Sequence, residues 1–334
     1  MRKPAIWVKI AMPLKKVSVS IVNYCGRELL AECLASVGRQ TYPSLETVVV
    51  DNASDDGSVE FVRESFPWAR VIENGRNELF CKAQNTGIGS TSGEYVLILN
   101  NDVVLHEDFV AEAVKAIEAD PKVGAVTGKI LRMDGRTLDT TGLFRGRDRR
   151  PVERGYGRPD EGRFEAPEYV FGTGGVCPLY RRECLDDASP DGEYFDPGYG
   201  AFYEDLDLAW RAQRKGWRAY YAPKAIAWHH RGATAQKKVA GKRSERDKGG
   251  MFSGFAYARL PDFLKARLLL NRYKTMIRND RLPEFFRDLP WILLYDLKLW
   301  GYTLLFSPRA LPGFIKGLPG LAAAWRRRRE FNGN

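Results

Sequence analysis

The sequence predicts an α/β domain with a mostly parallel sheet flanked by helices, followed by a helical extension at the C-terminus. Strand-like and helix-like segments alternate over the first 130 residues. Alternation of this kind implies parallel strands joined by crossover helices that cover both faces of the sheet. Beyond residue 250 the pattern is helical, with a long apolar run at 291–306.

The first four strands and the helices between them follow from local patterns. Residues 17–22 are rich in valine and isoleucine, and the next segment spaces its leucines as one face of a helix does. In order, we expect strands at 17–22, 45–50, 69–74 and 93–100, with helices within 26–40, 51–66 and 82–90 between them. The strand at 95–99 is entirely apolar and therefore buried on both faces, yet it ends in two asparagines and Asp102.

The second half of the domain is less regular. Residues 131–171 are rich in Gly, Arg, Asp and Pro without an apolar period, which predicts a long surface loop. The chain then returns to the core at 169–180. Residues 202–217 read as a helix and 218–230 as a strand, a turn and a second strand.

Composition and charge narrow the class of protein. The 334 residues suit one large domain with additions or two domains. Five dispersed cysteines without a Cys-x-x-Cys pair indicate reduced intracellular thiols and argue against zinc. The N-terminus lacks the apolar core of a signal peptide, so we expect a cytoplasmic protein. From Arg231 onward there are 22 basic and 8 acidic residues. This local excess of basic residues argues against a general nucleic-acid-binding surface and favours a local element that binds an anionic lipid or an anionic substrate.

The C-terminal third predicts contact with a membrane surface. A helix over 291–306 extends only about 24 Å, short of the roughly 30 Å hydrocarbon core, and it carries Asp296 and Lys298. A helix in the interface fits better than a span, and the arginines at 326–329 beside Trp325 suit anionic lipid. Packing on the catalytic domain with a solvated tail is the alternative. The basic segment 232–250 is either a mobile lid over a diphosphate or a connector.

Four features separated in sequence carry the candidate chemistry. Asp51 and Asp102 follow strands directly, and the carboxyl ends of parallel strands are where ligands bind. Glu204 and Asp205 open a helix, and His229 ends a strand. Together they would form a site for a divalent cation and a diphosphate, with a spare carboxylate as base, because Mg²⁺ and Mn²⁺ need few protein ligands when phosphates complete their shell.

Each feature also has an ordinary structural explanation. Asp51 suits a turn, and Asp102 suits the N-terminus of the following helix. The Glu204–Asp205 pair suits the N-terminus of a helix, where negative charge interacts favourably with the helix dipole. His229 is by default a packed core histidine, and residues 172–175 (GTGG) a tight turn or bulge.

The order and spacing of the blocks VSVSIVNY, VVVDNASDDGS, NNDVVL, FYEDLDLAWRAQRKGW and APKAIAWHH resemble the family 2 glycosyltransferases, in particular their bacterial rhamnosyltransferase-like branch. The resemblance covers roughly residues 15–232. It implies the GT-A fold, a Rossmann-like nucleotide-diphospho-sugar transferase architecture. It implies a catalytic domain at 1–230, with a nucleotide-binding half at about 15–130 and an acceptor half at about 131–230. A flexible basic loop at 231–250 and a helical, membrane-associating region at 251–334 would follow.

The resemblance also implies roles for individual residues. Asp205 matches the general base, with Glu204 orienting it, and His229 matches a metal or diphosphate contact. The residues expected to bind the nucleotide sugar are Val22, Asn23, Asp51, Asn77, Lys82, Asn101 and Asp102. Asp102 stands where the family's DxD motif binds Mg²⁺ or Mn²⁺, but here the motif reads Asn100-Asn101-Asp102, which leaves one carboxylate.

We therefore expect an inverting glycosyltransferase, peripheral on the cytoplasmic membrane face. The resemblance implies rhamnose transfer from dTDP-rhamnose, with a UDP-sugar as the next candidate, to a cell-surface glycan or lipid-linked saccharide. A nucleotidyltransferase more often has a glycine- and lysine-rich loop after the first strand, and an oxidoreductase needs G-x-G-x-x-G there; residues 20–30 have neither. An inactive scaffold with the same fold is the alternative from another class.

Overall fold

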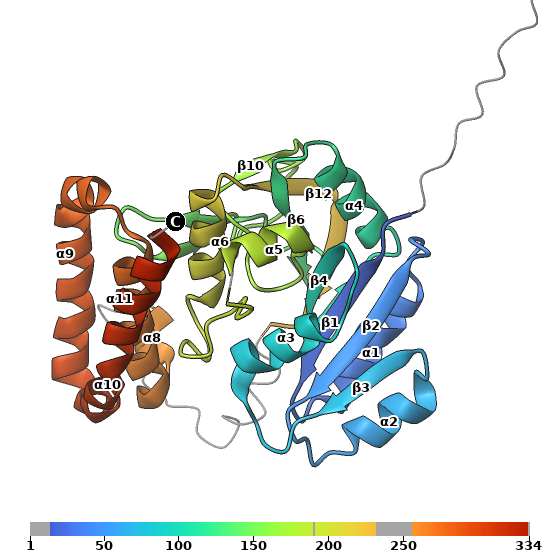
Figure 1. Cartoon of the computed structure of the whole chain (residues 1–334), viewed down its shortest axis with the longest axis horizontal. Helices are drawn as coiled ribbons and strands as arrows, with labels where there is room; N and C mark the ends of the chain where they lie inside the picture. The colour runs from blue at the N-terminus through green and yellow to red at the C-terminus, as the bar shows by residue number, and fades with distance from the viewer. Residues whose placement is uncertain (1–13, 190, 232–255, 333–334) are drawn as a thin grey trace, which may run out of the picture.

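The computed structural model describes residues 14–189, 191–231 and 256–332. The predicted basic lid at 232–250 lies outside the described residues. Within them the chain forms a mixed central sheet with helices on both faces and a C-terminal group of helices on one side (Figure 1). The predicted α/β class with a helical extension is confirmed.

Four parallel strands form one half of the sheet. They are β1 (Val17–Asn23), β2 (Leu45–Asp51), β3 (Ala69–Glu73) and β4 (Tyr95–Asn100). β1 lies between β4 and β2 in exact register, with Asn23 opposite Asp51 and Val22 opposite Asn100. Their polar carboxyl ends therefore meet at one edge of the sheet.

The other half of the sheet is mixed. Its long strands, β6 (Val123–Arg132) and β12 (Arg218–His229), are parallel to each other, with His229 opposite Arg132. The antiparallel strand β11 (Leu179–Arg181) joins β6 to β4. The short strands β5 (Val103–Leu105), β7 (Leu138–Thr140) and β10 (Glu168–Val170) add antiparallel pairings. The strand order is β10-β12-β6-β11-β4-β1-β2-β3.

Alternate residues of the buried strands supply two cores, one on each face. Val17, Val19 and Ile21 pack with α1 (Arg27–Gly38) and α4 (Phe109–Glu118), near α2 (Ser58–Ser65). Val96 and Ile98 pack with α3 (Leu79–Gly89), α5 (Arg182–Ala188) and α6 (Glu204–Arg214). Because both faces are covered, β4 is apolar from Tyr95 to Leu99 and polar only at its end, Asn100.

Two expectations for the second half were wrong. Residues 131–171 are not a structureless loop: they contain β7, β10 and the hairpin of β8 (Leu143–Arg145) and β9 (Pro151–Glu153). The segment lacks an apolar period because several of its buried residues, Asp139 and Arg149 among them, are charged and paired. Residues 218–229 form one strand, β12, with a register shift between Ala222 and Ile226 instead of a turn.

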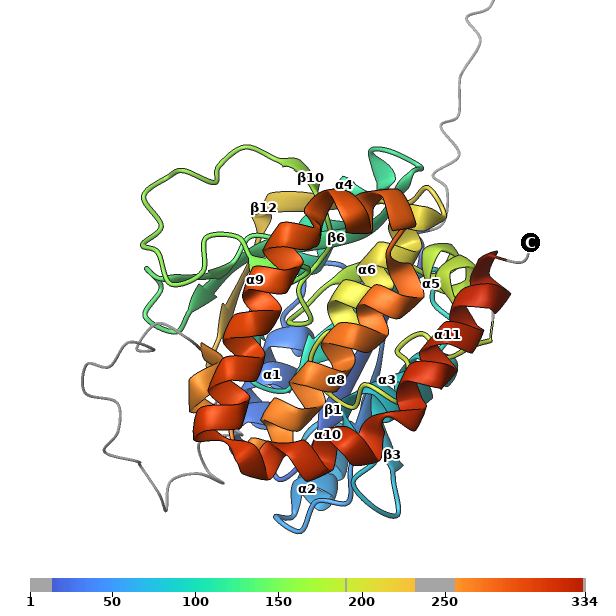
Figure 2. The ribbon, with the colours of Figure 1, turned by 90° about the vertical axis from the view of Figure 1, so that its left-hand side faces the viewer.

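The C-terminal helices pack together on one side of the sheet domain (Figure 2). α8 (Asp262–Asn279) lies against α6, and α10 (Leu311–Gly317) and α11 (Pro319–Asn332) lie against α8. α9 (Leu282–Phe306) is outermost. Short 3₁₀ turns at Ala256–Arg259 and Pro308–Ala310 connect these helices. None of the helices in the described ranges combines the length and apolarity needed to cross a bilayer.

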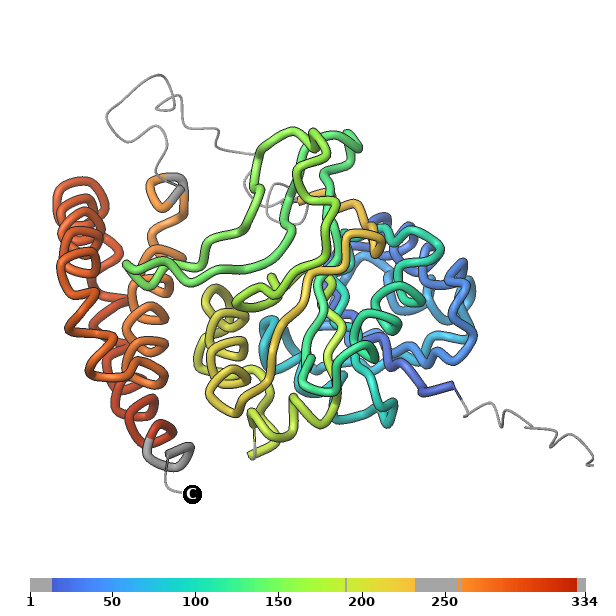
Figure 3. Tube along the Cα trace, turned by 90° about the horizontal axis from the view of Figure 1, so that it is seen from above, coloured from blue at the N-terminus to red at the C-terminus, as the bar shows by residue number. Residues whose placement is uncertain are grey.

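The β8–β9 hairpin holds these helices in place. Figure 3 shows it, in green, reaching from the sheet to α8 and α9. At its tip the buried guanidinium of Arg149 bonds to Asp280 at 2.7 Å and Asp288 at 2.9 Å. The neighbouring Arg145 pairs with Glu284 at 3.1 Å. A paired, buried cluster of this kind depends on every partner, since removing one leaves an uncompensated charge.

Candidate active site

Side chains at three adjacent strand ends form one hydrogen-bonded row. The Asn101 amide donates to Asn23 Oδ1 at 2.8 Å, and the Asn23 amide donates to Asp51 Oδ2 at 2.9 Å. All three residues are buried. Gly26 allows this row, since a Cβ there would lie 2.4 Å from Asn101 Nδ2. The row presents the ends of β4, β1 and β2 as one polar surface next to Val22.

Asp51 both caps the turn after β2 and takes part in the row of strand-end side chains. Its carboxylate accepts from the Ser54 backbone N–H at 2.8 Å and from the Ser54 hydroxyl at 2.7 Å, so it does cap a turn. The same Oδ2 also holds Asn23. Asp51 therefore shapes the turn after β2 and belongs to the row of strand ends.

Asn77 and Lys82 lie in a segment that is tied to this edge by a residue not predicted, Asn52. The buried Asn52 accepts from the Asn74 amide at 2.8 Å and donates to the Leu79 carbonyl at 3.4 Å. The side chains of Asn77 and Lys82 are exposed. Asn77 accepts from the Leu79 N–H, and Lys82 pairs with Glu78 at 2.9 Å. The structure thus places them beside the row but not in contact with it.

Asp102 and His229 meet, and a third residue completes their arrangement. Asp102 Oδ1 lies 3.2 Å from His229 Nε2, and Asp139 Oδ2 lies 2.8 Å from His229 Nδ1. Asp139 also pairs with Arg231. Burial alone would lower the pKa of His229, but the two carboxylates outweigh it and raise that pKa to about 9. Asp139 was not predicted, because the segment that carries it reads as a loop.

The helix-cap alternative for Asp102 is wrong. β5 follows Asp102 directly, and α4 begins only at Phe109. The β5 strand pairs antiparallel with β12, with Val103 opposite His229. That pairing is what brings the end of β4 against the end of β12.

Glu204 and Asp205 open α6, as predicted, after a constrained loop. Phe202 and Tyr203 both have positive φ, 70° and 72°, which is uncommon for residues with side chains. The buried Asn271 of α8 donates to the carbonyls of Ala201 and Phe202, each at 2.9 Å, and to that of Tyr199 at 3.0 Å. A C-terminal helix thus fixes the loop that carries the predicted base.

The two carboxylates at this helix start are electrostatically unusual. Burial raises the pKa of Glu204 and of Asp205, and the charge of Asp205 raises that of Glu204 further. Glu204 Oε2 has no hydrogen-bond partner among the described residues. Asp205 accepts from the Leu206 N–H at 2.7 Å, as a helix-start carboxylate does. Perturbed carboxyl groups of this kind are characteristic of functional sites.

A further carboxyl group, Glu153 of β9, connects the two sides of the site. It accepts from the Thr140 hydroxyl, next to Asp139. On its other side it faces Gly174, where a Cβ would lie 2.7 Å from Glu153 Oε1. Burial, together with the charge of Asp205, raises the pKa of Glu153 to about 8. The sequence carries no signal for Glu153 because it lies in the segment predicted as a loop.

The glycine segment 172–175 closes the site. The Asn100 N–H donates to the Val176 carbonyl at 3.0 Å, which fixes this segment beside the end of β4. A Cβ on Gly175 would lie 4.0 Å from Asp205 Oδ2. Contacts therefore run from Asp102 through His229, Asp139, Thr140 and Glu153 to Gly174, Gly175 and Asp205.

Asp102 and His229 fit a divalent cation with two protein ligands. No group of three or more His, Cys, Asp or Glu side chains that could hold a metal is found in the part of the chain that the structure describes. The pair nevertheless offers one oxygen and one imidazole nitrogen, 3.2 Å apart. Asp139 holds the opposite ring nitrogen, which is the support that metal-binding histidines usually have. Two such ligands suffice when substrate phosphates supply the rest.

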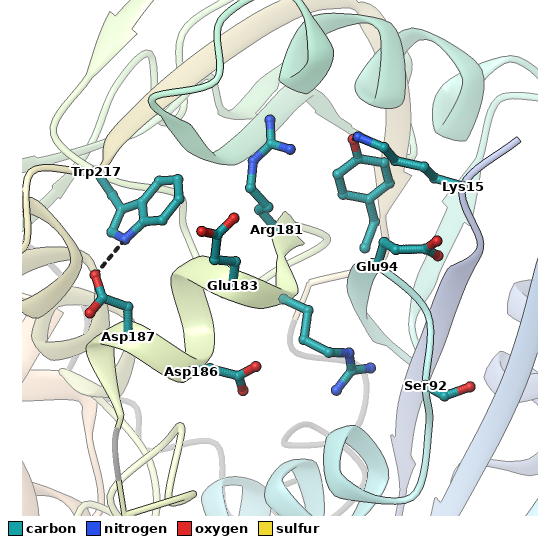
Figure 4. A pocket seen from close by; sticks show the side chains of 10 residues that line it. Lys15, Ser92, Glu94, Arg181, Glu183, Asp186, Asp187 and Trp217 are labelled. Atoms are coloured by element: carbon teal, nitrogen blue, oxygen red, sulfur yellow. Dashed lines mark hydrogen bonds between the residues drawn. The ribbon is translucent and has the colours of Figure 1, made fainter. Parts of the chain in front are cut away.

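A separate cavity lies at the opposite edge of the sheet. Its volume is about 800 Å³, and its lining includes Lys15, Glu94, Arg181, Asp187 and Trp217 (Figure 4). Several of these groups are engaged: Arg181 donates to the Ile117 carbonyl at 2.7 Å, and Trp217 donates to Asp187 at 2.9 Å. This cavity lies near the amino ends of β1 and β4, away from the assembled carboxylates.

The architecture and the polar strand ends define a GT-A-fold transferase. The chain belongs to glycosyl transferase family 2, whose pattern matches residues 18–188. The resemblance inferred from the sequence blocks is confirmed.

Relatives extend this similarity. An N-acetylglucosaminyltransferase of Bradyrhizobium elkanii is 36% identical over 122 residues, which are 34% of this chain and 66% of that protein. The N-acetylglucosaminyl-diphospho-decaprenol L-rhamnosyltransferase of Mycobacterium tuberculosis is 26% identical over 238 residues, 64% of this chain and 75% of that protein. The matched region thus spans about two thirds to three quarters of these relatives.

Solved structures share the fold. TarS 1–349 of Staphylococcus aureus in complex with UDP-GlcNAc aligns with a TM-score of 0.60 and 18% identity, covering 95% of this chain and 83% of that one. The mannosyltransferase PcManGT of Pyrobaculum calidifontis in complex with GDP-Man and Mn²⁺ aligns with a TM-score of 0.53 and 24% identity, covering 93% and 76%.

Proposed function

We propose that this chain is an inverting, divalent-metal-dependent glycosyltransferase that moves a sugar from a nucleotide diphosphate to a saccharide acceptor at the cytoplasmic face of the membrane. The observation that carries the proposal is the continuous set of contacts from the Asp102–His229 pair to Asp205 in one site. dTDP-rhamnose is the first candidate donor, which the name of the mycobacterial relative supports, and a UDP-sugar is the second. A cell-surface glycan or lipid-linked saccharide is the acceptor.

The donor's nucleotide occupies the strand-end row. Asn23 and Asp51, held rigid by mutual hydrogen bonds, offer an amide and a carboxylate for the base and ribose beside the backbone of Val22. The segment with Asn77 and Lys82 borders the nucleotide from α3. Asn101 keeps this row in line with Asp102, where the diphosphate lies.

The cation's place is between Asp102 and His229. When bound there, Mg²⁺ or Mn²⁺ neutralises the negative charge of the donor diphosphate. The mannosyltransferase with GDP-Man and Mn²⁺ shares the fold, which supports this assignment. His229 must then be neutral at Nε2, while its Nδ1–H remains directed at Asp139.

Asp205 acts as the general base. An acceptor hydroxyl is a poor nucleophile, so a carboxylate that takes its proton as the new bond forms lowers the barrier. The raised pKa of Asp205 makes its ionised form more basic than an ordinary aspartate. One displacement opposite the leaving diphosphate inverts the anomeric carbon. Glu204, directly beside Asp205, orients it.

The competing functions are less well supported. A scaffold that had lost activity would not need to keep Asp102, His229, Asp139, Glu153 and Asp205 in contact around one site. For a nucleotidyltransferase the expected glycine- and lysine-rich loop is missing after β1, where residues 24–26 lead into α1 through a single glycine. Glycosyl transfer gives a role to Asp102, Asp139, Glu204 and Asp205.

Isothermal titration with dTDP, UDP and GDP, each with and without Mn²⁺, tests the donor site first. Tight binding of one nucleotide that requires Mn²⁺ supports the proposal and identifies the nucleotide. Binding independent of Mn²⁺ would remove Asp102 from metal binding. If none of the three nucleotides binds, the inactive scaffold becomes the better explanation.

A further inference from the structure

The outward face of α9 is more apolar than its inward face. Leu282, Phe286, Leu293, Leu297 and Leu304 recur at intervals of four or seven residues, so they form one stripe along the helix. All are exposed, Leu297 at 71% and Leu293 at 57%. The inward positions include Asp288 and Thr303, which are buried. An amphipathic helix packed on a soluble domain has the reverse arrangement.

The charges of the same region are segregated. Between residues 281 and 328, all three acidic side chains turn inward and pair with arginines: Glu284 with Arg145 at 3.1 Å, Asp288 with Arg149 at 2.9 Å and Asp296 with Arg272 at 2.7 Å. The exposed charged residues of this range are all basic: Arg281, Arg287, Lys298, Arg309, Lys316 and Arg326.

The basic residues flank the apolar stripe. Arg287 and Lys298 share the adjoining row of α9 with Leu294 and Leu305, which are 69% and 75% exposed. Beyond α9, Lys316 follows the exposed Ile315, and Arg326 follows the exposed Trp325. Of the terminal arginines, Arg327 pairs with Glu193 and Asp196 and Arg328 donates to the Ile277 carbonyl, so these two contribute less to this surface than the sequence suggests.

We propose that the outward face of α9, with the adjoining basic residues of α10 and α11, is a docking surface for an anionic phospholipid bilayer on which α9 lies parallel to the membrane plane. An apolar stripe flanked by Lys and Arg is the composition of helices that lie in the lipid interface. The 25 residues of α9 give about 37 Å of contact along its axis. This inference rests on the proposed function, for which it names the membrane partner.

A second copy of the chain fits this face less well. In a twofold dimer the same patch lies on both sides of the interface. The basic residues that flank α9 would then face their own copies, and this outward face offers no exposed acid between residues 281 and 328 to offset them. A surface of anionic headgroups instead offers opposite charges to this basic face, in which Arg287 also pairs with Asp288 at 3.0 Å.

Docking through α9 would also set the position of the active site relative to the membrane. The inward face of α9 holds the tip of the β8–β9 hairpin through Arg149, and Glu153 follows four residues later in the carboxylate site. The membrane surface and the acceptor side of the site are thus joined by one short, ion-paired hairpin. A saccharide carried on a lipid would approach from the side of this hairpin.

Vesicle sedimentation of the full chain, without donor or acceptor, tests the surface. We expect the wild type to bind vesicles of phosphatidylcholine with phosphatidylglycerol and to bind phosphatidylcholine alone at least tenfold more weakly. Leu293→Glu with Leu297→Glu should weaken binding at least about tenfold. Lys316→Glu with Arg326→Glu should remove the preference for phosphatidylglycerol. Trp68→Glu changes an apolar residue that is 47% exposed and lies far from α9 in the sheet domain; it is the control and should bind as the wild type does.

The outcomes separate this inference from the proposed function. If the leucine variant binds vesicles as the wild type does, or if the wild type does not bind, docking through α9 is refuted, while nucleotide titration still reports on the donor site. If the leucine variant converts a wild-type dimer to a monomer in light scattering, the face is covered by a second copy and the proposal is wrong. Circular dichroism establishes that each variant is folded.

Discussion

Asn271→Leu tests whether a C-terminal helix fixes the catalytic loop. The Asn271 amide has two hydrogens shared among three backbone carbonyls at 2.9–3.0 Å, in a fully buried position. Leucine has a similar size but no donor, so about two buried carbonyls lose their partner. At about 1–3 kcal/mol for each of the two orphaned groups, the free energy of unfolding should fall by about 2–6 kcal/mol. A domain with a stability of about 10 kcal/mol stays folded after such a loss.

Turnover should suffer more than donor binding does. With the amide gone, the carbonyls of Ala201 and Phe202 lose their bonds to α8, and we expect the Asp205 carboxylate to shift from its position. We expect kcat to fall about 10- to 100-fold while the donor KM changes by less than about threefold, measured by steady-state transfer assays. The strand-end row, which we propose binds the donor, has no hydrogen bond to Asn271.

Gln40→Leu is the matched control for this experiment. The Gln40 amide also serves backbone groups, the His106 carbonyl at 2.8 Å and the Val110 N–H at 3.0 Å, but on the α1 and α4 side of the sheet. Its loss should lower stability similarly and leave kcat unchanged at a temperature where both variants are folded. Equal losses of kcat in the two variants would refute the reasoning, because turnover would then follow stability alone.

Three further predictions address the carboxylates and the hairpin. Asp205→Asn should bind the donor nucleotide as the wild type does in calorimetry yet lose transfer by at least about 100-fold; near-normal turnover would exclude it as the base. The pKa of Glu153 is about 8 in the folded state and 4.5 for an ordinary glutamate. Between these pH values the unfolded chain loses this proton and the folded state keeps it, so the wild type loses stability as the pH rises. Glu153→Gln should therefore gain in Tm relative to the wild type from pH 5 to pH 9, and a constant difference would contradict this. Arg149→Met takes from the buried Asp280 its partner at 2.7 Å, leaving Arg145 at 3.9 Å, and from Asp288 the buried one of its three arginines; it should cost about 3–5 kcal/mol in urea unfolding, against less than about 1 kcal/mol for the more exposed Arg147→Met, and equal costs would argue against the clamp.

The parts of the fold predictable from the sequence are those specified by local patterns. β1, β2 and β4 are short apolar runs between turn residues, and the residues that end them, Asp51 and Asp102, lie where the pattern places them. Their mutual proximity follows from the parallel arrangement alone. Sequence reasoning therefore placed Asn23, Asp51, Asn101 and Asp102 at one edge of the sheet, and their binding of the donor stays a prediction.

The acceptor side escaped prediction because its buried residues are polar. Asp139 pairs with His229, 90 positions away, and Asn271 bonds to carbonyls 69 to 72 positions away, and no periodicity records partners at such distances. Glu153 accepts from Thr140, 13 positions away, but both residues lie in the segment predicted as a loop. Arg149, buried at the tip of a hairpin predicted as a loop, shows the same limit. Contacts of this kind can be identified only from the folded structure.

The order of strands in the sheet also suggests where two related enzymes could be joined to make a chimaera. Asn23, Asp51, Asn101 and Asp102 all belong to the first 105 residues, whereas Asp139, Glu153 and Asp205 come from later segments that meet them through β11 and β12. A chimaera joined in the segment between β5 and α4 would therefore inherit its nucleotide preference from one parent and its acceptor preference from the other. The contacts to be kept across the junction include the pairing of β11 with β4, the pairing of Val103 with His229 and the contact of Asp102 with His229.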